Sequence, residues 1–334
     1  MNHKRISKKM GIAIFCLLAG IMALIIILHH NSFADPQEEL VKKIIACVLI
    51  VLSCIIFIIF YDKLTVLPVE LFENRRLIWK LARNDFKKRY AGSYLGIIWA
   101  LVQPVVTVVM YWFVFENFMG SKAQFLSSGT SMPYVLFLAA GLCPWFYFSE
   151  ALNNGTTALL EYNYLVKKVV FKISILPIIK VIAATFIHLF FVLVLLIVAA
   201  CYGCYPTIYT IQIIYYSFCT FILVLGLSYT TCAIVIFFRD LTQIISIVLQ
   251  VGMWATPILW SIAVLEDKPP IWNTIIKINP LVYIVNGYRS ALCEKQWFFE
   301  DFYSTMYFWI FTVVVFGIGA LIFKRLKVHF ADVL

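Results

Sequence analysis

Charged residues are scarce in this sequence, and that scarcity excludes a water-soluble globular protein. Asp, Glu, Lys and Arg make up 13% of the 334 residues, whereas 63% are hydrophobic. A chain of this length with so few charges cannot cover a globular surface with groups that water solvates well. The composition therefore predicts an all-α polytopic membrane protein, because helices satisfy their backbone hydrogen bonds inside a bilayer.

Motifs for catalysis are also missing. The chain has no GxxxxGK[ST] phosphate loop, no DxD pair of carboxylates and no HExxH motif, so it cannot hydrolyse ATP by itself through a P-loop. His30 and Asp35 match the HxxxxD spacing of some acyltransferases, but no partner motif accompanies them and chance is the favoured interpretation. Cys201 and Cys204 form a CxxC pair without a second pair or a neighbouring His, so we predict no metal site.

Long apolar runs, in contrast, are abundant. Eight of them are long enough to cross a bilayer, at residues 11–28, 44–60, 97–118, 134–156, 178–202, 211–238, 244–262 and 303–323. Residues 271–292 are also apolar, but the polar and helix-breaking positions Asn279, Pro280, Asn286, Gly287 and Arg289 interrupt them. That interruption predicts a re-entrant or interfacial element. The first run is expected to remain in the mature protein as a span, because no cleavage site follows it.

The distribution of Lys and Arg predicts the orientation. With the N-terminus placed inside, the inside segments carry 19 of the 27 basic residues and the outside loops carry 7. Both termini are therefore expected to face the cytoplasm. The net charge of +10 follows mostly from this bias. It favours anionic membrane lipid as a partner, and no nucleic-acid-binding module is visible.

A basic segment precedes the third apolar run. Its basic positions recur at spacings of four, three and four residues and are Arg76, Lys80, Arg83 and Lys87. Its apolar positions fall on the opposite side of the helical wheel and are Leu71, Ile78, Ala82 and Phe86. This pattern predicts an amphipathic helix lying at the lipid headgroups. A plain juxtamembrane segment that obeys the topology rule is the alternative.

Two short charged turns between long apolar runs are candidate docking points for a soluble partner. The first, residues 159–171, has Glu161, Lys167 and Lys168 as expected exposed residues. Leu165 and Val166 are available in the same turn for insertion into a groove. The second turn is FFRDL at residues 237–241. Ordinary inside loops would carry the same positive charge, and this alternative stays open.

Aromatic rings are dense in the third and fourth runs. Tyr111, Trp112 and Phe115 share one helical face, and the next run contributes Trp145, Tyr147 and Phe148. Rigid amphipathic rings can line a conduit for a sugar chain, whose faces are apolar and whose edges are polar. Packing between helices and an interfacial aromatic belt are the alternatives.

Seven segments in a fixed order resemble the membrane subunits of ABC-2 type ABC transporters that export polysaccharides, including the O-antigen and teichoic-acid exporters. They are KLARNDFKKRYAGSYLGIIWALVQP (80–104), LFLAAGLCPWFYFSEAL (136–152), NYLVKKVVFKISILP (163–177), FFRDL (237–241), TPILW (256–260), INPL (278–281) and FADVL (330–334). Together they cover about residues 72–334. The chain begins differently, since residues 1–62 add a two-span hairpin. We therefore expect three parts: this hairpin, a cytoplasmic interfacial segment at 63–93, and an ABC-2 permease domain at 94–334.

The resemblance implies a six-span permease that forms a homodimer, pairs with two separate ABC ATPase subunits and moves a lipid-linked polysaccharide outward. ATP and Mg would bind the ATPase, and this chain would hold no cofactor. A coupling helix at 163–172 is implied to sit in the ATPase, and Arg239 and Asp240 to form a second contact. The ATPase-coupling residues would be Glu161, Asn163, Leu165, Val166, Lys167, Lys168, Arg239 and Asp240.

The same resemblance places the basic helix beside a lateral gate, where it would hold the diphosphate of the carrier lipid. The residues concerned are Arg76, Lys80, Arg83, Lys87, Lys88 and Arg89. Charge-assisted hydrogen bonds from Arg and Lys suit such a group. Two other functions remain open at this point: an ABC-2 exporter of a small amphiphile or drug, and a transferase acting on polyprenyl-linked sugars. The transferase should show interfacial acidic pairs, which this chain lacks.

Overall fold

The structure is a computed structural model that describes residues 8–28, 36–89, 92–94, 96–120, 123–125, 131–166, 172–265, 268–294 and 296–333. Its chain divides into two compact units, Met1–Arg75 and Arg76–Leu334. Each unit is described by itself below. Within the described residues, six helices are long and apolar enough to cross a membrane: Lys8–Leu28, Gln37–Tyr61, Tyr134–Glu161, Ile173–Cys201, Ile208–Val235 and Phe302–His329.

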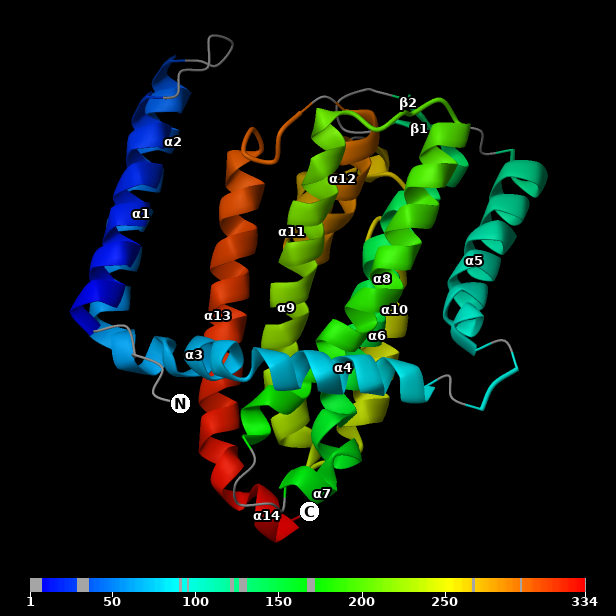
Figure 1. Cartoon of the computed structure of the whole chain (residues 1–334). Helices are drawn as coiled ribbons and strands as arrows, with labels where there is room; N and C mark the ends of the chain where they lie inside the picture. The colour runs from blue at the N-terminus through cyan, green and yellow to red at the C-terminus, as the bar shows by residue number, and fades with distance from the viewer. Residues whose placement is uncertain are drawn as a thin grey trace. The chain divides into compact units, whose positions relative to one another are not determined.

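The first unit is a helical hairpin followed by a short helix. Its helices are α1 (Lys8–Leu28), α2 (Pro36–Leu64) and α3 (Val66–Glu73). The rings of Phe15 and Phe57 stack with centroids 4.0 Å apart, which joins α1 to α2. Gly11 lies against Tyr61 so closely that a Cβ atom would be 2.2 Å from the tyrosine hydroxyl. The two predicted apolar spans of residues 1–62 are therefore both present as long helices (Figure 1).

The second unit is a bundle built around α6. Its longer helices are α4 (Arg75–Arg89), α5 (Trp99–Trp112), α6 (Tyr134–Glu161), α8 (Leu176–Cys201), α9 (Gln212–Val235), α10 (Leu241–Ala255) and α13 (Phe302–Leu326). Helix α6 is buried along most of its length, as expected for a helix enclosed by others. Gly319 of α13 lies against α9, and a Cβ atom there would be 2.4 Å from the carbonyl oxygen of Gly226. Small residues permit this close approach of two membrane helices.

Short elements connect these helices. They are α7 (Asn163–Val166), α11 (Pro270–Lys277), α12 (Pro280–Cys293), α14 (Phe330–Val333), the π-helix η2 (Phe113–Phe118), and the 3-10 helices η1 (Gly96–Ile98), η3 (Ile173–Ile175), η4 (Ile208–Ile211), η5 (Ile262–Leu265) and η6 (Lys327–His329). Strands β1 (Ala123–Phe125) and β2 (Ser131–Pro133) pair antiparallel, with Gln124 opposite Met132. Figure 1 shows β1 and β2 at one end of the bundle and α7 and α14 at the other.

Two predicted spans, at 97–118 and 244–262, are not among the six long helices, and the described residues give shorter apolar helices there, at Val105–Phe118 and Leu241–Ala255. The sequence predicts a span at 244–262, but α10 ends at Ala255 and has 15 residues, about 22 Å at 1.5 Å per residue. It ends there because Thr256 is extended, with ψ of 137°, and Pro257 disfavours helical geometry in the residue before it. The prediction for 244–262 was therefore wrong about the C-terminal end of this helix.

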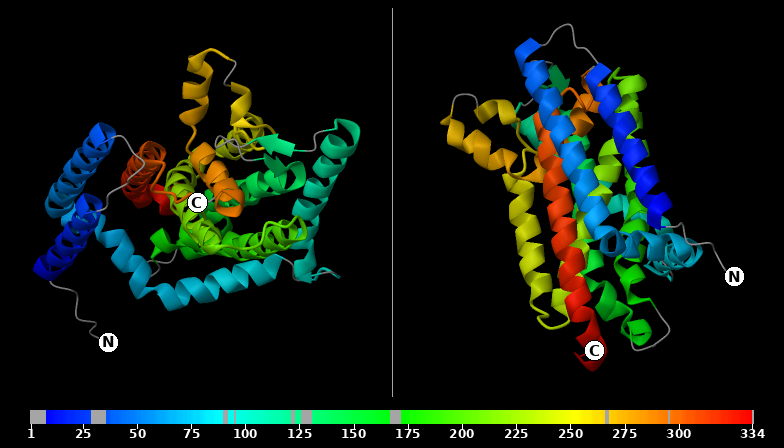
Figure 2. Two further views of the ribbon diagram at one scale, coloured as in Figure 1. Left: turned by 90° about the horizontal axis from the view of Figure 1, so that it is seen from above. Right: turned by 90° about the vertical axis from the view of Figure 1, so that its left-hand side faces the viewer.

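The predicted interruption at 271–292 is confirmed at Asn279 and Pro280, where α11 gives way to α12, whereas Asn286, Gly287 and Arg289 lie inside α12 and do not break it. Helices α11 and α12 are separate elements, and Figure 2 shows α11 projecting from the end of the bundle that also carries β1 and β2, whereas α12 is buried along most of its length. Asn279 caps α12, since its side chain accepts a hydrogen bond from the backbone N–H of Leu281 at 3.0 Å. Its Nδ2 also donates to Thr256 Oγ1 at 2.8 Å, which ties the break between the two helices to the end of α10.

His188 joins four helices in the middle of the bundle. Its Nε2 lies 3.0 Å from the hydroxyls of both Ser217 in α9 and Tyr288 in α12. Its ring stacks on Tyr147 of α6, with centroids 4.4 Å apart. The residue itself belongs to α8 and is 2% exposed. Its side chain thus joins neighbouring helices by hydrogen bonds, as polar side chains do between membrane helices.

Candidate functional site at the junction of α4, α6 and α8

Helix α4 lies across the long helices instead of along them (Figure 1). Its buried residues are Ile78, Ala82 and Phe86, which confirms the predicted apolar stripe. Phe86 packs with Ala183 and Ile187 of α8. Leu71, the fourth residue of the predicted stripe, lies in α3 instead, because the helix breaks at Asn74.

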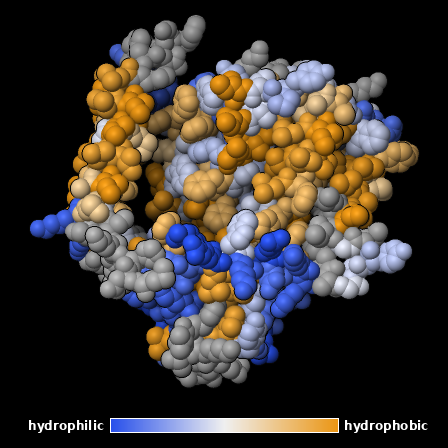
Figure 3. Space-filling model, viewed as in Figure 1, coloured by the Kyte–Doolittle hydropathy of each residue, from blue (hydrophilic) through white to orange (hydrophobic). Residues whose placement is uncertain are grey.

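The opposite face of α4 is basic and exposed. Figure 3 shows hydrophilic side chains gathered over α4, next to the apolar surface of the long helices. The predicted headgroup-binding residues are all exposed there: Arg76, Lys80, Arg83, Lys87, Lys88 and Arg89. A helix with one apolar face on protein and one cationic face outward is suited to contact anionic groups at a membrane surface.

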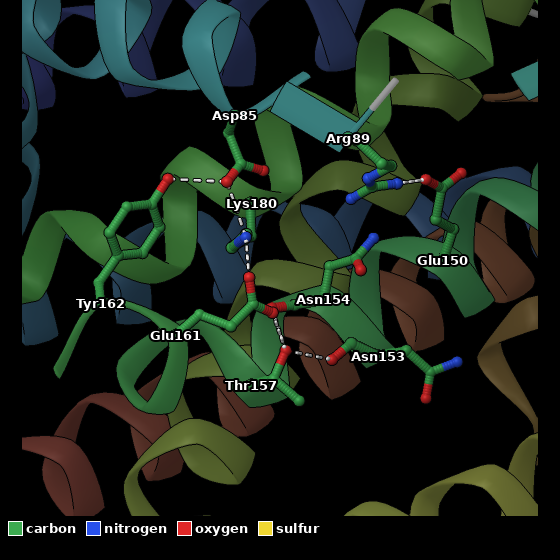
Figure 4. A network of polar contacts seen from close by, with 9 residues as sticks. All are labelled: Asp85, Arg89, Glu150, Asn153, Asn154, Thr157, Glu161, Tyr162 and Lys180. Atoms are coloured by element: carbon green, nitrogen blue, oxygen red, sulfur yellow. Dashed lines mark hydrogen bonds and ion pairs between the residues drawn. The ribbon is translucent and has the colours of Figure 1, made fainter. Parts of the chain in front are cut away.

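A buried ammonium group lies where α4 meets α6 and α8. Lys180 of α8 is 3% exposed. Its Nζ donates to Asp85 Oδ1 of α4 at 2.7 Å and to Glu161 Oε2, at the end of α6, at 2.6 Å (Figure 4). A buried cation is strongly unfavourable unless it is paired and hydrogen-bonded. The fold therefore depends on both carboxylates remaining near Lys180.

Tyr162 extends this group. Its hydroxyl donates to Asp85 Oδ1 at 2.7 Å, and the Lys180 ammonium lies 5.1 Å from the centre of its ring. Burial, and then the hydrogen bond to Asp85, raise the pKa of the Tyr162 hydroxyl, which stays protonated and remains a donor. We call Asp85, Glu161, Tyr162 and Lys180 the junction network.

Two further contacts surround the junction network. Thr157 Oγ1 donates to Glu161 Oε1 at 2.7 Å, one turn earlier in α6. Arg89, the last residue of α4, forms an ion pair with Glu150 of α6. Figure 4 shows this pair beside the junction network, so α4 is held to α6 by polar contacts at two places.

A polar cavity of about 370 Å³ opens between these contacts. Its lining combines the junction network with the basic end of α4 and consists of Asp85, Lys88, Arg89, Asn154, Glu161, Tyr162, Tyr164 and Lys180. The lining carries the cations Lys88, Arg89 and Lys180 and the carboxylates Asp85 and Glu161, and both Lys180 and Arg89 are already ion-paired. Among the described residues, no group of three or more His, Cys, Asp or Glu side chains is arranged to hold a metal ion.

The predicted ATPase-coupling residues lie at one end of the bundle. Asn163, Leu165 and Val166 form α7, whereas Lys167 and Lys168 lie outside the described residues. Arg239 and Asp240 are exposed in the turn between α9 and α10. The views in Figures 1 and 2 place α7, this turn and α14 at the same end.

Two of these residues have surroundings that the sequence did not predict. Val166 is 3% exposed, so its side chain is already covered within this chain and is not free for a partner's groove. Glu161 belongs to the junction network, although its side chain is 49% exposed. Helix α7 therefore presents mainly Asn163 and Tyr164 outward.

The predicted conduit aromatics lie in two environments. Trp145, Tyr147 and Phe148 of α6 are buried within the bundle at 2–6% exposure. The rings of Tyr111 and Phe115 meet edge-on, with their centroids 6.3 Å apart. Trp112 donates to Glu116 Oε2 at 2.6 Å and lines an apolar cavity of about 130 Å³ between α5, α6 and α8. The conduit stays a prediction.

The sequence did not identify four residues whose side chains join different helices or segments: Asp85, Tyr162, Lys180 and Arg289. Lys180 gave a usable signal, because an ionisable residue inside an apolar run is a functional candidate by default. Arg289 is 1% exposed, and its guanidinium donates to the carbonyls of Pro257 and Ile258 at 2.7 and 2.8 Å. It thereby holds α12 to the segment that follows α10.

Apolar helices of membrane length, a crosswise basic helix and a pair of short broken helices define a multi-pass membrane protein. Residues 76–293 match the family described as ABC-2 type transporter, and the chain belongs to this family. The match begins at the first residue of the second unit. The chain is thus a transport permease, and ATP hydrolysis belongs to a separate subunit.

Comparison with curated proteins gives the same class. The chain is 26% identical over 263 residues to the O-antigen export system permease protein RfbA of Myxococcus xanthus, in an alignment that covers 79% of this chain and 97% of that protein. Two O-antigen export system permease proteins RfbA of Klebsiella pneumoniae are each 27% identical to it over 261 residues, covering 77% of this chain and 95% of theirs.

Proposed function

We propose that this chain is the membrane permease of an ATP-driven exporter that moves a lipid-linked polysaccharide, of the O-antigen, capsule or teichoic-acid type, out across a bacterial cytoplasmic membrane. The observation that carries the proposal is the similarity to O-antigen export permeases over 95–97% of their length. The family match over residues 76–293 supports the same transport class.

The substrate's charged end would meet the basic face of α4. Arg83, Lys87 and Lys88 are exposed on this helix, and Lys88 also lines the polar cavity. A diphosphate that joins a glycan to its carrier lipid carries negative charge at the headgroup level, where such a helix would lie. Cationic side chains there would concentrate the substrate near its entry point and orient its anionic group.

The energy would come from ABC ATPase subunits at the end of the bundle that carries α7, Arg239 and Asp240. This end would face the cytoplasm, as the excess of Lys and Arg in those segments favours. A second copy of the chain would complete the pathway, and the pair would bind two ATPases. Residues 8–64, which precede the family match, would form an additional anchor in the same membrane.

The proposal is tested by removing the chain's gene from its native cell and by purifying the tagged protein from native membranes. Deletion should leave lipid-linked glycan accumulated on the inner leaflet, and the purified protein should carry an ABC ATPase and a polyprenyl-linked glycan. Recovery of a small amphiphile in place of the glycan, with normal surface glycan after deletion, would overturn the proposed substrate class.

A further inference from the structure

We infer that the junction network is the link through which movement of α7 reaches α4, so that Asp85, Tyr162 and Lys180 are positioning residues for coupled transport. This inference rests on the proposed function, in which the ATPase acts near α7 and the substrate's anionic group lies on α4. It adds the residues that connect these two places.

Tyr162 is the centre of the link because it holds both elements at once. Its backbone carbonyl accepts hydrogen bonds from the N–H groups of Leu165 and Val166, at 2.8 and 3.2 Å, and so begins α7. Its side-chain hydroxyl donates to Asp85 of α4 at 2.7 Å. A displacement of α7 therefore pulls on the same residue that holds α4.

The buried charge makes the link stiff. The side chain of Lys180 is 4% exposed and that of Asp85 is 10% exposed, so exchanging either partner for water would be strongly unfavourable in free energy. Glu161, which directly precedes Tyr162, binds the same ammonium group at 2.6 Å. When the junction of α6 and α7 moves, Asp85 must follow or leave a buried cation with one carboxylate fewer.

The remaining attachments of α4 allow such a movement to act as a tilt. Its apolar face rests on α8 through Phe86, Ala183 and Ile187, and the ring of Phe186 in α8 contacts the rings of Trp79 and Phe86. Its last residue, Arg89, is paired with Glu150, about 16 Å from Glu161 along α6 at 1.5 Å per residue. Asp85 is tied to Tyr162 and to Lys180 of α8, and Arg89 is tied to Glu150, so motion of the α6–α7 junction that displaces Tyr162 and Glu161 would turn α4 about its anchor at Arg89 and rotate the basic face.

The test compares Tyr162→Phe and Asp85→Asn with a matched control, Tyr205→Phe, whose ring is 71% exposed in the loop between α8 and α9. Each variant is assembled with its ATPase in liposomes that contain the lipid-linked glycan. Three quantities are measured: ATPase bound per permease, ATP turnover, and glycan transported per ATP. Tyr162→Phe retains the ring and removes only the hydroxyl, so it decides the question even if Asp85→Asn fails to assemble.

Tyr162→Phe is expected to bind the ATPase and hydrolyse ATP as the wild type does, while glycan transported per ATP falls roughly tenfold, the effect of losing one hydrogen bond to a charged group. The double variant should be no worse than the more impaired single variant, because both substitutions weaken the contact between Tyr162 and Asp85. Wild-type transport per ATP in Tyr162→Phe, or loss of ATPase binding in parallel with transport, overturns the link. Absence of glycan transport by the wild-type complex would instead contradict the proposed function.

Discussion

Lys180 is a cation held almost entirely away from solvent, between carboxylates contributed by α4 and by the end of α6. Its contacts of 2.7 Å to Asp85 and 2.6 Å to Glu161 replace the water that the ammonium group loses. Such a group adds little stability in itself, but it makes the arrangement specific, because each partner becomes costly to remove. At the residue scale, the junction network therefore fixes where α4 can lie.

Lys180→Met tests this residue directly. The substitution removes the cation and leaves Asp85 and Glu161 facing each other, which should destabilise the protein by about 3–5 kcal/mol. The measurement is the thermal unfolding midpoint of the purified protein in detergent. Lys268→Met, at an exposed position between η5 and α11, serves as the control and should leave the midpoint unchanged. An equal midpoint for both variants would contradict the role given to Lys180.

The exposed cations of α4 should contribute to substrate affinity and not to the stability of the fold. Arg83→Gln, Lys87→Gln and Lys88→Gln together should weaken binding of a polyprenyl diphosphate about tenfold or more while the unfolding midpoint stays unchanged, because surface charges contribute little stability. The matched control replaces Lys324, Arg325 and Lys327 by Gln, three cations at the other end of the chain. Unchanged lipid affinity in the α4 variant would remove the headgroup role from this helix.

At the element scale, α12 is placed by contacts far apart in sequence. Its C-terminal residue Cys293 has its Sγ 3.5 Å from that of Cys204, in the loop between α8 and α9. Cys201, the other cysteine of the CxxC pair, is exposed, and Cys204 contacts α12. The loop and the end of α12 are therefore close enough for a cross-link.

Mild oxidation of the intact protein should join Cys204 to Cys293, since small side-chain rotations can bring two sulfur atoms this close to bonding distance. Peptide mapping without reduction should find the linked pair. The Cys201→Ser variant should still form it, and Cys293→Ser should not. Recovery of Cys204 linked to Cys201 in the otherwise intact protein would contradict the placement of α12.

The sequence predicts elements better than it predicts their partners. Spacing alone identified Ile78, Ala82 and Phe86 as the buried face of α4, because a helix places every third or fourth residue on one side. Polar interruptions likewise identified the break between α11 and α12. The partners of Lys180 had no such signal: Asp85 precedes it by 95 residues and lies within a basic segment, so only the fold brings the two together.

At the scale of the whole molecule, the ABC-2 region and the segment before it belong to different compact units. The family match begins at Arg76, and the two helices α1 and α2 belong to the other unit. Composition predicted both helices as spans, and both are long and apolar enough for that role. Nothing in their side chains explains why this permease has them.

The central claim is that this chain provides the passage while a separate ATPase provides the energy. The most direct measurement is transport of a lipid-linked glycan across liposomes that contain the purified chain, with and without its ATPase. Transport should require the ATPase together with hydrolysable ATP, and the chain alone should leave the glycan on its original side. Movement of the glycan by the chain alone, at the rate of the complete complex, would contradict the account.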